Sequence, residues 1–474
     1  MKTVIRMALI TGGIAVLFNA LSNLALAVDS IHQPISAIQT AYHNDKYFET
    51  APYLVEPNEY VAANLQNSQE TPASERSGES VVQETEESFG SGTEPVPSTP
   101  QPWHLPQPCF LQEHNIAMGG WVQQGITGVS RMPDNRSLGS LATNDRAAEY
   151  QLNQAWLFLN RPINNQGDGW DWGGRLDLIY GTDWRFANTL GLENVFNGAY
   201  QLYGLALPQS YLDVAYNNLT VRLGHWAPSV GLEIVPAVAN FFYSHEYGMA
   251  YGQPLLVTGA LGIYKLNDQW SINAGANRGW YMFEDNNHAW DGMGGIEWTS
   301  PGKWTTVRFN VDSGPQLDPF GNNTRSVYTL TATQKITEQW TYALEHNFGI
   351  EENAGPRGSN ADWYGLTNYL FYTINPHWST GIRAEFFRDD DGARVFGIGN
   401  QPDIRGWTGG PGFEGTFTEL TLGVNWRPHP NCVLRPEARW DWYNGTRDVR
   451  DDLPFDDGTR SDQFTFAADL IVTF

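Results

Sequence analysis

The chain has little cysteine and little positive charge. Its 474 residues include only two cysteines, so at most one disulfide can form within it. The 28 Lys and Arg stand against 52 Asp and Glu, which gives a net charge of -24. Because nucleic acid binding needs a basic footprint, this balance argues against nucleic acid as a partner.

Motifs for catalysis and metal binding are also missing from the sequence. The ten histidines are scattered, without a His-x-x-x-His or Cys/His cluster that could hold a metal. No G-x-S-x-G motif and no phosphate-binding glycine loop occurs. We therefore expect no cofactor, no metal site and no catalytic residues.

A long hydrophobic run occurs only at the N-terminus. The basic residues Lys2 and Arg6 precede an apolar run from Met7 to Leu26, and Ala25-Leu26-Ala27 has the small-x-small pattern of a signal peptidase site. Residues 1–27 are therefore predicted to be a cleaved signal peptide. A retained anchor is the alternative, but glycine and asparagine interrupt the run. No later stretch is long enough for a membrane helix, so a helical membrane protein is excluded.

Residues 28–108 form an acidic region with 12 acidic and 2 basic residues. Its second half is rich in Glu, Ser, Thr, Gln and Pro, and such a composition buries too little apolar surface to offset chain entropy. We expect this region to be disordered and to lie in the periplasm. The sequence leaves open whether it is a plain spacer or attaches to the cell wall or a partner.

The C-terminal segment Asp462–Phe474 alternates between two faces. Phe464, Phe466, Leu470, Val472 and Phe474 share one face, and mostly polar residues occupy the other. Fifteen further segments of similar length precede it, and most are near the roughly 9–11 residues of a tilted membrane strand. The sixteen predicted strands are 119–130, 150–161, 170–183, 210–216, 219–226, 255–266, 269–280, 290–299, 303–313, 325–336, 339–349, 363–373, 377–388, 414–427, 432–443 and 462–474.

Short turns and long polar loops alternate between these strands. Asn217-Asn218 and Asn375-Pro376 are examples of the turns, and 184–209 and 389–413 are examples of the loops. The content of aromatic residues (13%) and the 48 glycines also suit barrel girdles and strand bends. The pattern predicts an all-β fold, a transmembrane antiparallel up-and-down β-barrel of about 16 strands over residues 109–474. A soluble all-β protein has no reason to alternate its loop lengths so regularly.

Several segments, in order, resemble the OmpL-like family of β-barrel porins. They include Tyr150–Gln154, Trp170–Asp183, Tyr203–Gln209, Asn240–His245 and Tyr264–Asp268. The resemblance runs from about Cys109 to Phe474 and omits residues 28–108. It implies a pore in the outer membrane of a Gram-negative envelope, and no catalytic residues carry over. The expected partners are outer-membrane lipids, the barrel-assembly machinery that would recognise Phe474 as a C-terminal signal, small hydrophilic solutes and a possible homotrimer.

Charged residues on the polar faces of the strands are candidates for lining the lumen. Charges facing hydrocarbon cost roughly 2–4 kcal/mol near mid-bilayer, whereas charges facing water cost little. The candidates are Arg175, Asp177, Arg222, Arg308, Asp312, Glu345, Arg383, Glu385, Arg435, Glu437, Arg439 and Asp441. They either filter solutes by charge and size or simply satisfy one another and keep the lumen hydrated. The sequence leaves both interpretations open.

The third long loop, residues 227–254, is unusually apolar for an exposed loop. We expect it to fold into the barrel and narrow the pore, with Glu233, His245 and Glu246 as polar candidates at the constriction. Packing over the mouth or at a trimer interface is the alternative.

The two cysteines fall at the same end of the predicted barrel. Cys109 precedes the first strand and Cys432 lies at the turn before the fifteenth, roughly 10–15 Å away across two or three strands. A disulfide between Cys109 and Cys432 would pin the acidic region to the rim, and two free thiols are the alternative.

The function predicted from these features is passive diffusion of small hydrophilic solutes through an outer-membrane porin. A structural or adhesive barrel with a closed lumen is the first alternative, and a barrel hydrolase built on Ser, His and Asp is a weaker one. Acidic loop runs at Asp389–Asp391 and Asp448–Asp457 could bind divalent cations, but they lack full ligand spacing and are better interpreted as solvated loops.

Overall fold

The computed structural model describes residues 101–197, 201–318, 321–395, 412–448 and 450–474. The predicted signal peptide and residues 28–100 of the acidic region lie outside the described residues. Within the described part of the chain, no helix is both long enough and apolar enough to cross a membrane.

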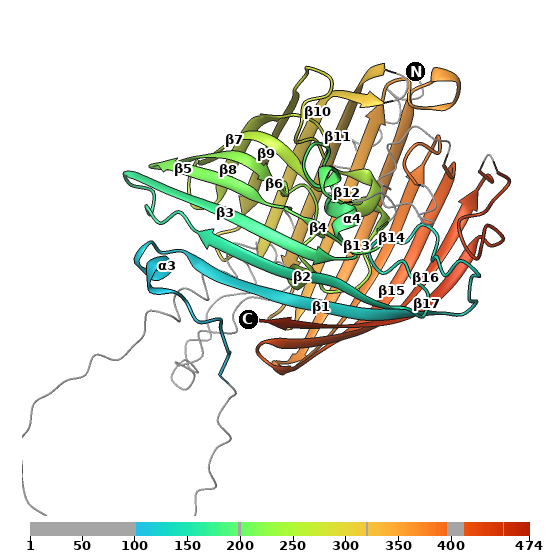
Figure 1. Ribbon diagram of the computed structural model, residues 1–474, viewed down its shortest axis with the longest axis horizontal. Helices are drawn as coiled ribbons and strands as arrows, with labels where there is room; N and C mark the ends of the chain where they lie inside the picture. The colour runs from blue at the N-terminus through green and yellow to red at the C-terminus, as the bar shows by residue number, and fades with distance from the viewer. Residues whose placement is uncertain (1–100, 198–200, 319–320, 396–411, 449) are drawn as a thin grey trace, which may run out of the picture. The chain divides into compact units, whose positions relative to one another are not determined.

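Antiparallel strands form most of the regular secondary structure of the described residues, with a few short helical turns in the connections (Figure 1). The strands are β1 (Ala117–Val129), β2 (Tyr150–Arg161), β3 (Trp170–Gly181), β4 (Gly204–Ala206), β5 (Ser210–Tyr216), β6 (Leu219–Trp226), β7 (Val257–Lys265), β8 (Trp270–Asn277), β9 (Asp291–Thr299), β10 (Thr305–Asp318), β11 (Gly321–Lys335), β12 (Trp340–Glu351), β13 (Ala361–Asn375), β14 (Trp378–Asp389), β15 (Gly415–His429), β16 (Cys432–Gly445) and β17 (Asp462–Thr473). The helical turns are α3 (Cys109–Glu113), α4 (Trp184–Ala187), η1 (Glu193–Val195), η2 (Ala237–Ala239), η3 (Gly248–Gly252) and η4 (Pro356–Gly358).

The sheet closes on itself because β1 pairs with both β2 and β17. Trp121 is in register with Trp156 on one side and with Thr473 on the other. The short strands β4 and β5 pair with successive parts of β3 and together make one barrel strand. The barrel therefore has sixteen strands, and the predicted fold class is confirmed.

All sixteen predicted segments contain a strand, and the differences lie at their ends. The clearest difference concerns the hairpin of β10 and β11, because β10 extends to Asp318 and β11 begins at Gly321. Residues 314–324, predicted as a loop, are therefore mostly a continued hairpin. Their polar composition indicated a loop, but backbone pairing between neighbouring strands continues regardless of side-chain polarity.

Burial is inverted relative to a soluble protein. On β17, Phe464 and Phe466 are 43% and 60% exposed, whereas Thr465 and Asp469 are each only 1% exposed. Outward Leu residues on β2, β3, β5 and β6 are exposed in the same way. A wall that is apolar outside and polar inside suits a barrel with hydrocarbon around it and water within.

The closing seam holds the last residue of the chain. Phe474 N–H donates to Gly120 O and Gly120 N–H donates to Phe474 O, both at 2.9 Å. A Cβ atom at Gly120 would lie 2.1 Å from Trp156 O and 2.8 Å from the Phe474 ring. Glycine is therefore required where the final aromatic ring crosses β1.

Deleting Phe474 should sharply reduce assembly of the barrel. The deletion removes two seam hydrogen bonds, each worth about 1 kcal/mol, so we expect at least roughly a tenfold loss of folded protein. The measurement is the amount of heat-modifiable barrel in the outer membrane by semi-native gel. Phe474→Tyr, which keeps both the ring and the backbone, is the control. Equal amounts of the deletion and this control would contradict a role for Phe474 as an assembly signal.

Residues ahead of β1 dock on the barrel rim at the end where the short turns lie, here called the turn end. The Trp103 ring stacks on His429 with centroids 4.1 Å apart. Trp103 N–H donates to Asn431 Oδ1 at 2.9 Å, and its indole N–H donates to Thr473 O at 3.0 Å. Gln107 exchanges two hydrogen bonds with the Met118 backbone. This contact ties residues 103–107 to the strands at the closing seam.

Replacing Trp103 with Ala should release this segment from the rim. The substitution removes the ring stack and one hydrogen bond, so local opening should increase about tenfold. The rate of chymotryptic cleavage after Phe110 in the detergent-purified protein measures this local opening. Trp103→Phe retains stacking and should fall between wild type and Trp103→Ala. Cleavage at the wild-type rate in Trp103→Ala would show that other contacts hold the segment.

The predicted disulfide between Cys109 and Cys432 is not formed, and both are free thiols. Cys432 begins β16 in register with Val472 of β17, and Val472 in turn faces Val122 of β1. Two strand spacings, roughly 10 Å, therefore separate Cys432 from Val122, and Cys109 lies in α3, ahead of the start of β1. A disulfide joins Cα atoms within about 7 Å. Strand order alone placed the two residues at the same rim, but it did not bring them close enough to bond. Trp103 makes the rim contact that the disulfide was expected to make.

Candidate functional site

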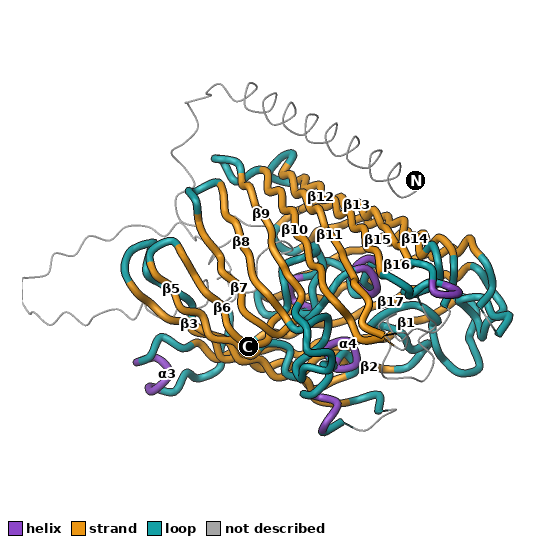
Figure 2. The backbone as a smooth tube through the Cα atoms, turned by 90° about the horizontal axis from the view of Figure 1, so that it is seen from above, coloured by secondary structure: helices purple, strands orange, loops and turns teal. Residues whose placement is uncertain are grey.

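Residues 227–254, here called the inner loop, lie inside the barrel and contact its wall. Figure 2 shows loop and helical segments enclosed by the ring of strands. The inner loop is hydrogen-bonded to side chains of β2, β10, β12, β13, β14, β15 and β16. These contacts cover one arc of the wall.

Charged wall residues hold the backbone of the inner loop directly. Glu385 accepts hydrogen bonds from Tyr247 N–H and Gly248 N–H, both at 2.7 Å. Glu437 accepts from Tyr243 N–H at 2.8 Å. Buried backbone groups need partners, so these carboxylates replace the water that would otherwise solvate the loop.

Arginines of the same arc hold the carbonyl groups of the inner loop. Arg435 donates to Asn240 O, and Arg439 donates to His245 O, each at 2.6 Å. Arg383 donates to Ser244 O at 2.7 Å. Together with the carboxylates, these contacts fix the loop along most of its length.

The first half of the inner loop crosses the lumen. Asn310 of β10 donates to Ser229 O at 3.0 Å, and Glu345 of β12 accepts from Leu232 N–H at 2.6 Å. Only three residues later, Gln154 of β2 donates to Val235 O at 2.7 Å. Since β2 and β10 lie far apart in the ring, the loop divides the lumen into a part filled by its own residues and a part next to β5–β9.

The predicted constriction residues Glu233, His245 and Glu246 lie in the seam between the loop and the wall. His245 Nδ1 is 2.9 Å from Glu233 Oε2, and Glu246 N–H donates to the same carboxylate at 3.1 Å. Arg383 donates to the other oxygen of Glu233 at 2.6 Å. All three residues are buried. Whether these three residues influence a constriction stays a prediction.

The inner-loop residues that remain exposed carry no charge. Seven of its residues retain exposure: Ala227, Ser229, Leu232, Ile234, Val238, Ala239 and Ala250. The loop's polar side chains are used against the wall, so its aliphatic side chains are left toward the lumen. The sequence showed that the loop is apolar but not which of its side chains would face water.

The twelve predicted lumen residues divide into two groups. Arg222 and Arg308 keep 14% and 25% of their side chains exposed. The other ten, Arg175, Asp177, Asp312, Glu345, Arg383, Glu385, Arg435, Glu437, Arg439 and Asp441, are at most 5% exposed. Seven of them, the residues of this group on β12, β14 and β16, lie under the inner loop. Their inward direction agrees with the alternation, and a role in lining the path stays a prediction.

Sequence reasoning missed the acidic partners of the two exposed arginines. Asp213 of β5 is directly opposite Arg222, with their charged atoms 2.9 Å apart. Glu297 of β9 is directly opposite Arg308 and forms an ion pair with it. Alternation places both acids on inward faces, so the cross-strand register was the signal that could have identified them.

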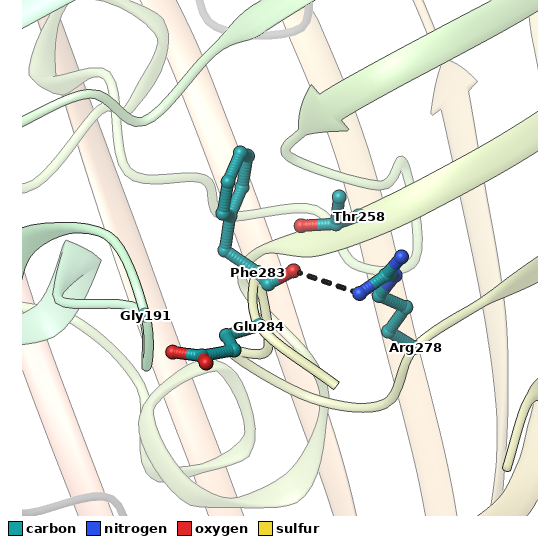
Figure 3. A pocket seen from close by; sticks show the side chains of 5 residues that line it. All are labelled: Gly191, Thr258, Arg278, Phe283 and Glu284. Atoms are coloured by element: carbon teal, nitrogen blue, oxygen red, sulfur yellow. Dashed lines mark hydrogen bonds between the residues drawn. The ribbon is translucent and has the colours of Figure 1, made fainter. Parts of the chain in front are cut away.

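A pocket of about 420 Å³ lies at the other end of the barrel, where the long loops lie. Gly191, Thr258, Arg278, Phe283 and Glu284 line it (Figure 3). Arg278 donates to Phe283 O at 3.4 Å, as the dashed line marks. No sequence signal pointed to this pocket because two separate loops and the start of β7 build it.

The acidic run of the last long loop is satisfied by its own neighbours. Burial opposes ionisation of Asp448, but hydrogen bonds from Asp452 N–H and Arg450 outweigh it, so the pKa of Asp448 lies below its ordinary value. The described residues contain no group of three or more His, Cys, Asp or Glu arranged to hold a metal ion.

Comparison with known proteins supports this architecture. Residues 115–474 match the family described as "Putative beta-barrel porin-2, OmpL-like". The anion-selective porin from Comamonas acidovorans is similar in structure, with a TM-score of 0.52 and 11% identity over 76% of this chain and 99% of that chain. The channel DcaP of Acinetobacter baumannii gives a TM-score of 0.49 and 12% identity over 76% and 97%. No curated protein matches the sequence. At such identities the solved structures support the fold alone.

Proposed function

Because the chain belongs to the OmpL-like family of β-barrel porins, we propose that it forms a passive diffusion pore in the outer membrane for small hydrophilic solutes. The observation that carries this proposal is the uneven covering of the lumen wall. Charged side chains under the inner loop, such as Arg383 and Glu385, are at most 2% exposed. The side chains of Glu297 and Arg308, beyond the loop, are 35% and 25% exposed. Water therefore reaches the wall on one side of the loop, and a solute would follow it.

In this proposal the inner loop is the constriction, and the covered charges hold it in place. Arg383, Glu385, Arg435, Glu437 and Arg439 bond the loop's backbone and so act on solutes only through its position. The residues that face the solute are the exposed arginines with their acidic partners and the uncovered aliphatic side chains of the loop. No step of this function requires a cofactor or catalytic residue.

The orientation follows from the proposed location. The chain would be exported with residues 1–27 as signal peptide, and the turn end, with the docked residues 103–107, would face the periplasm. Lipids would contact the exposed Leu and aromatic residues of the outer wall, and the barrel-assembly machinery would insert the chain. We also propose a homotrimer, which analytical ultracentrifugation in detergent tests by the mass of the protein component.

Liposome swelling with uncharged sugars of rising size tests the pore. We expect rapid swelling with pentoses and hexoses and a sharp loss of rate with larger oligosaccharides. The alternative function, a structural or adhesive barrel with a closed lumen, predicts no swelling with any sugar. Heat-modifiable migration of the same preparation shows that the barrel is folded, so absence of swelling would reject the pore.

A further inference from the structure

The uncovered part of the lumen has two sides, and neither carries net charge of one sign. One side is the inner loop, whose residues that retain exposure are six aliphatic residues and Ser229. This inference rests on the proposed function and concerns which solutes the pore accepts. The loop, rather than the covered wall, forms one boundary of the space next to β5–β9.

The facing wall combines small, apolar and amide side chains with paired charges. Ile263 of β7, Asn273 of β8 and Met293 of β9 point inward with partial exposure, as the alternation with outward Tyr264, Ile272 and Ile296 shows. The inner-face glycines of β8 and β9, Gly275 and Gly295, bring the wall's backbone close to the lumen. Such a surface offers hydrogen bonds and apolar contact but little charge.

The partly exposed charges on this wall stand in cross-strand pairs. Arg222 and Asp213 lie 2.9 Å apart, and Arg308 is bonded to Glu297. Opposite charges this close cancel at distances beyond the pair, and salt screens the remainder over about 8 Å at physiological ionic strength. Each pair therefore presents a local dipole that can orient a polar solute without attracting ions of one sign.

The acidic excess of the lumen lies elsewhere, under the inner loop. There Arg383 bonds Glu233 and Glu419, and Arg435 bonds Asp469. The side chains of these five residues are at most 6% exposed. Because the loop separates them from the uncovered space, they contribute less to the passage than the exposed pairs do.

We propose that the passage between the inner loop and β5–β9 takes uncharged polar solutes of sugar size, and that it discriminates little between small cations and anions. An ion must pass aliphatic side chains that give no compensation for lost hydration, whereas a neutral polyol loses less and can bond the dipoles of the ion pairs. Arg308 with Glu297 is the pair that balances the selectivity, since it is the more exposed of the two.

Reversal potentials in a KCl gradient across a planar bilayer test the proposal. We expect a K⁺ to Cl⁻ permeability ratio within about twofold of one for the wild type. Glu297→Gln removes the negative charge opposite Arg308 and should shift the permeability ratio toward Cl⁻ by about threefold, whereas Arg308→Gln should shift it toward K⁺ by a similar factor. Asp268→Asn removes one charge from an exposed turn, where Asp268 pairs with Lys265, and is the matched control.

Swelling rates give an independent readout that needs no substitution. Galactose should enter faster than galacturonate or galactosamine, which have nearly the same size but opposite charges, and the two charged sugars should enter at similar rates.

A wild-type K⁺ to Cl⁻ permeability ratio more than about fivefold from one would overturn the proposal. Shifts of this ratio in Glu297→Gln and Arg308→Gln that are no larger than the shift in Asp268→Asn would also overturn it. Complete absence of conductance from a folded barrel would instead reject the pore itself.

Discussion

Replacing residues 229–253 with a short Gly-Ser linker is expected to raise single-channel conductance about threefold and to admit larger oligosaccharides in liposome swelling. The inner loop crosses the lumen from Asn310 to Gln154 and packs against the arc of wall beyond. Its removal exposes that arc to water and widens the cross-section for ions and solutes. The uncovered Arg and carboxylate side chains then gain water as a partner, so the barrel should still close.

A deletion in another long loop provides the control. Residues 450–459 lie in the last long loop, where Asp457 accepts a hydrogen bond from Asp134 N–H. Replacing this segment with the same linker should change conductance by less than about a third, because its described hydrogen bonds run to residues 134 and 135 and within its own loop, and none runs to the inner loop. If the inner-loop deletion and this control conduct equally, the inner loop does not limit the pore.

Arg383→Ala is expected to have the largest effect of any single substitution on stability. Arg383 is fully buried and donates to Glu419 and Glu233 at 2.6 Å and to Ser244 O at 2.7 Å. Alanine removes the nearest cation from two buried carboxylates and leaves them only the weaker contacts to Arg439 and His245. Removing one partner of a buried pair costs about 3–5 kcal/mol. The loop should detach locally, giving frequent current fluctuations toward higher conductance.

Urea unfolding in detergent micelles and single-channel recording measure the two effects together. Arg383→Lys retains the charge but not the planar guanidinium group, so its loss of stability should lie between those of the wild type and Arg383→Ala. Arg388→Ala removes an arginine from the same strand whose partner, Asp390, is partly exposed, and should cost less than about 1 kcal/mol. Equal losses in Arg383→Ala and Arg388→Ala would show that Arg383 does not anchor the loop.

The anchoring of the inner loop also explains why two sets of residues, wall charges and polar loop residues, have surroundings that differ from those predicted. Glu345 and Glu437 point inward as expected, but they end at loop backbone rather than at lumen water. Glu233 and His245 are polar residues of the loop, and they turn toward the wall for the same reason. Buried polar groups need hydrogen-bond partners. The charged side chains of the wall and the polar groups of the loop therefore bond to each other. The inner-loop side chains that stay exposed are therefore aliphatic, apart from Ser229.

Sequence patterns were sufficient to predict the strands, their inward and outward faces and the order of turns and loops. Alternation with a period of two is a local property, so Phe466 and Thr465 could be assigned to opposite faces without any partner strand. The final segment could be placed at the closing seam because a last strand that ends in an aromatic residue, here Phe474, resembles the closing strand of an outer-membrane barrel. Charged residues could be assigned to the inside because hydrocarbon excludes them.

Only the tertiary structure decided which inward residues meet water. The inner loop joins β10, β12 and β2 through residues far apart in the chain, and no local pattern encodes which arc it covers. Alternation places Arg308 and Glu297 inside the barrel, but their exposure depends on where the inner loop lies. Such properties arise from closure of the ring, because closure brings together groups whose separation along the chain carries no information about their separation in space.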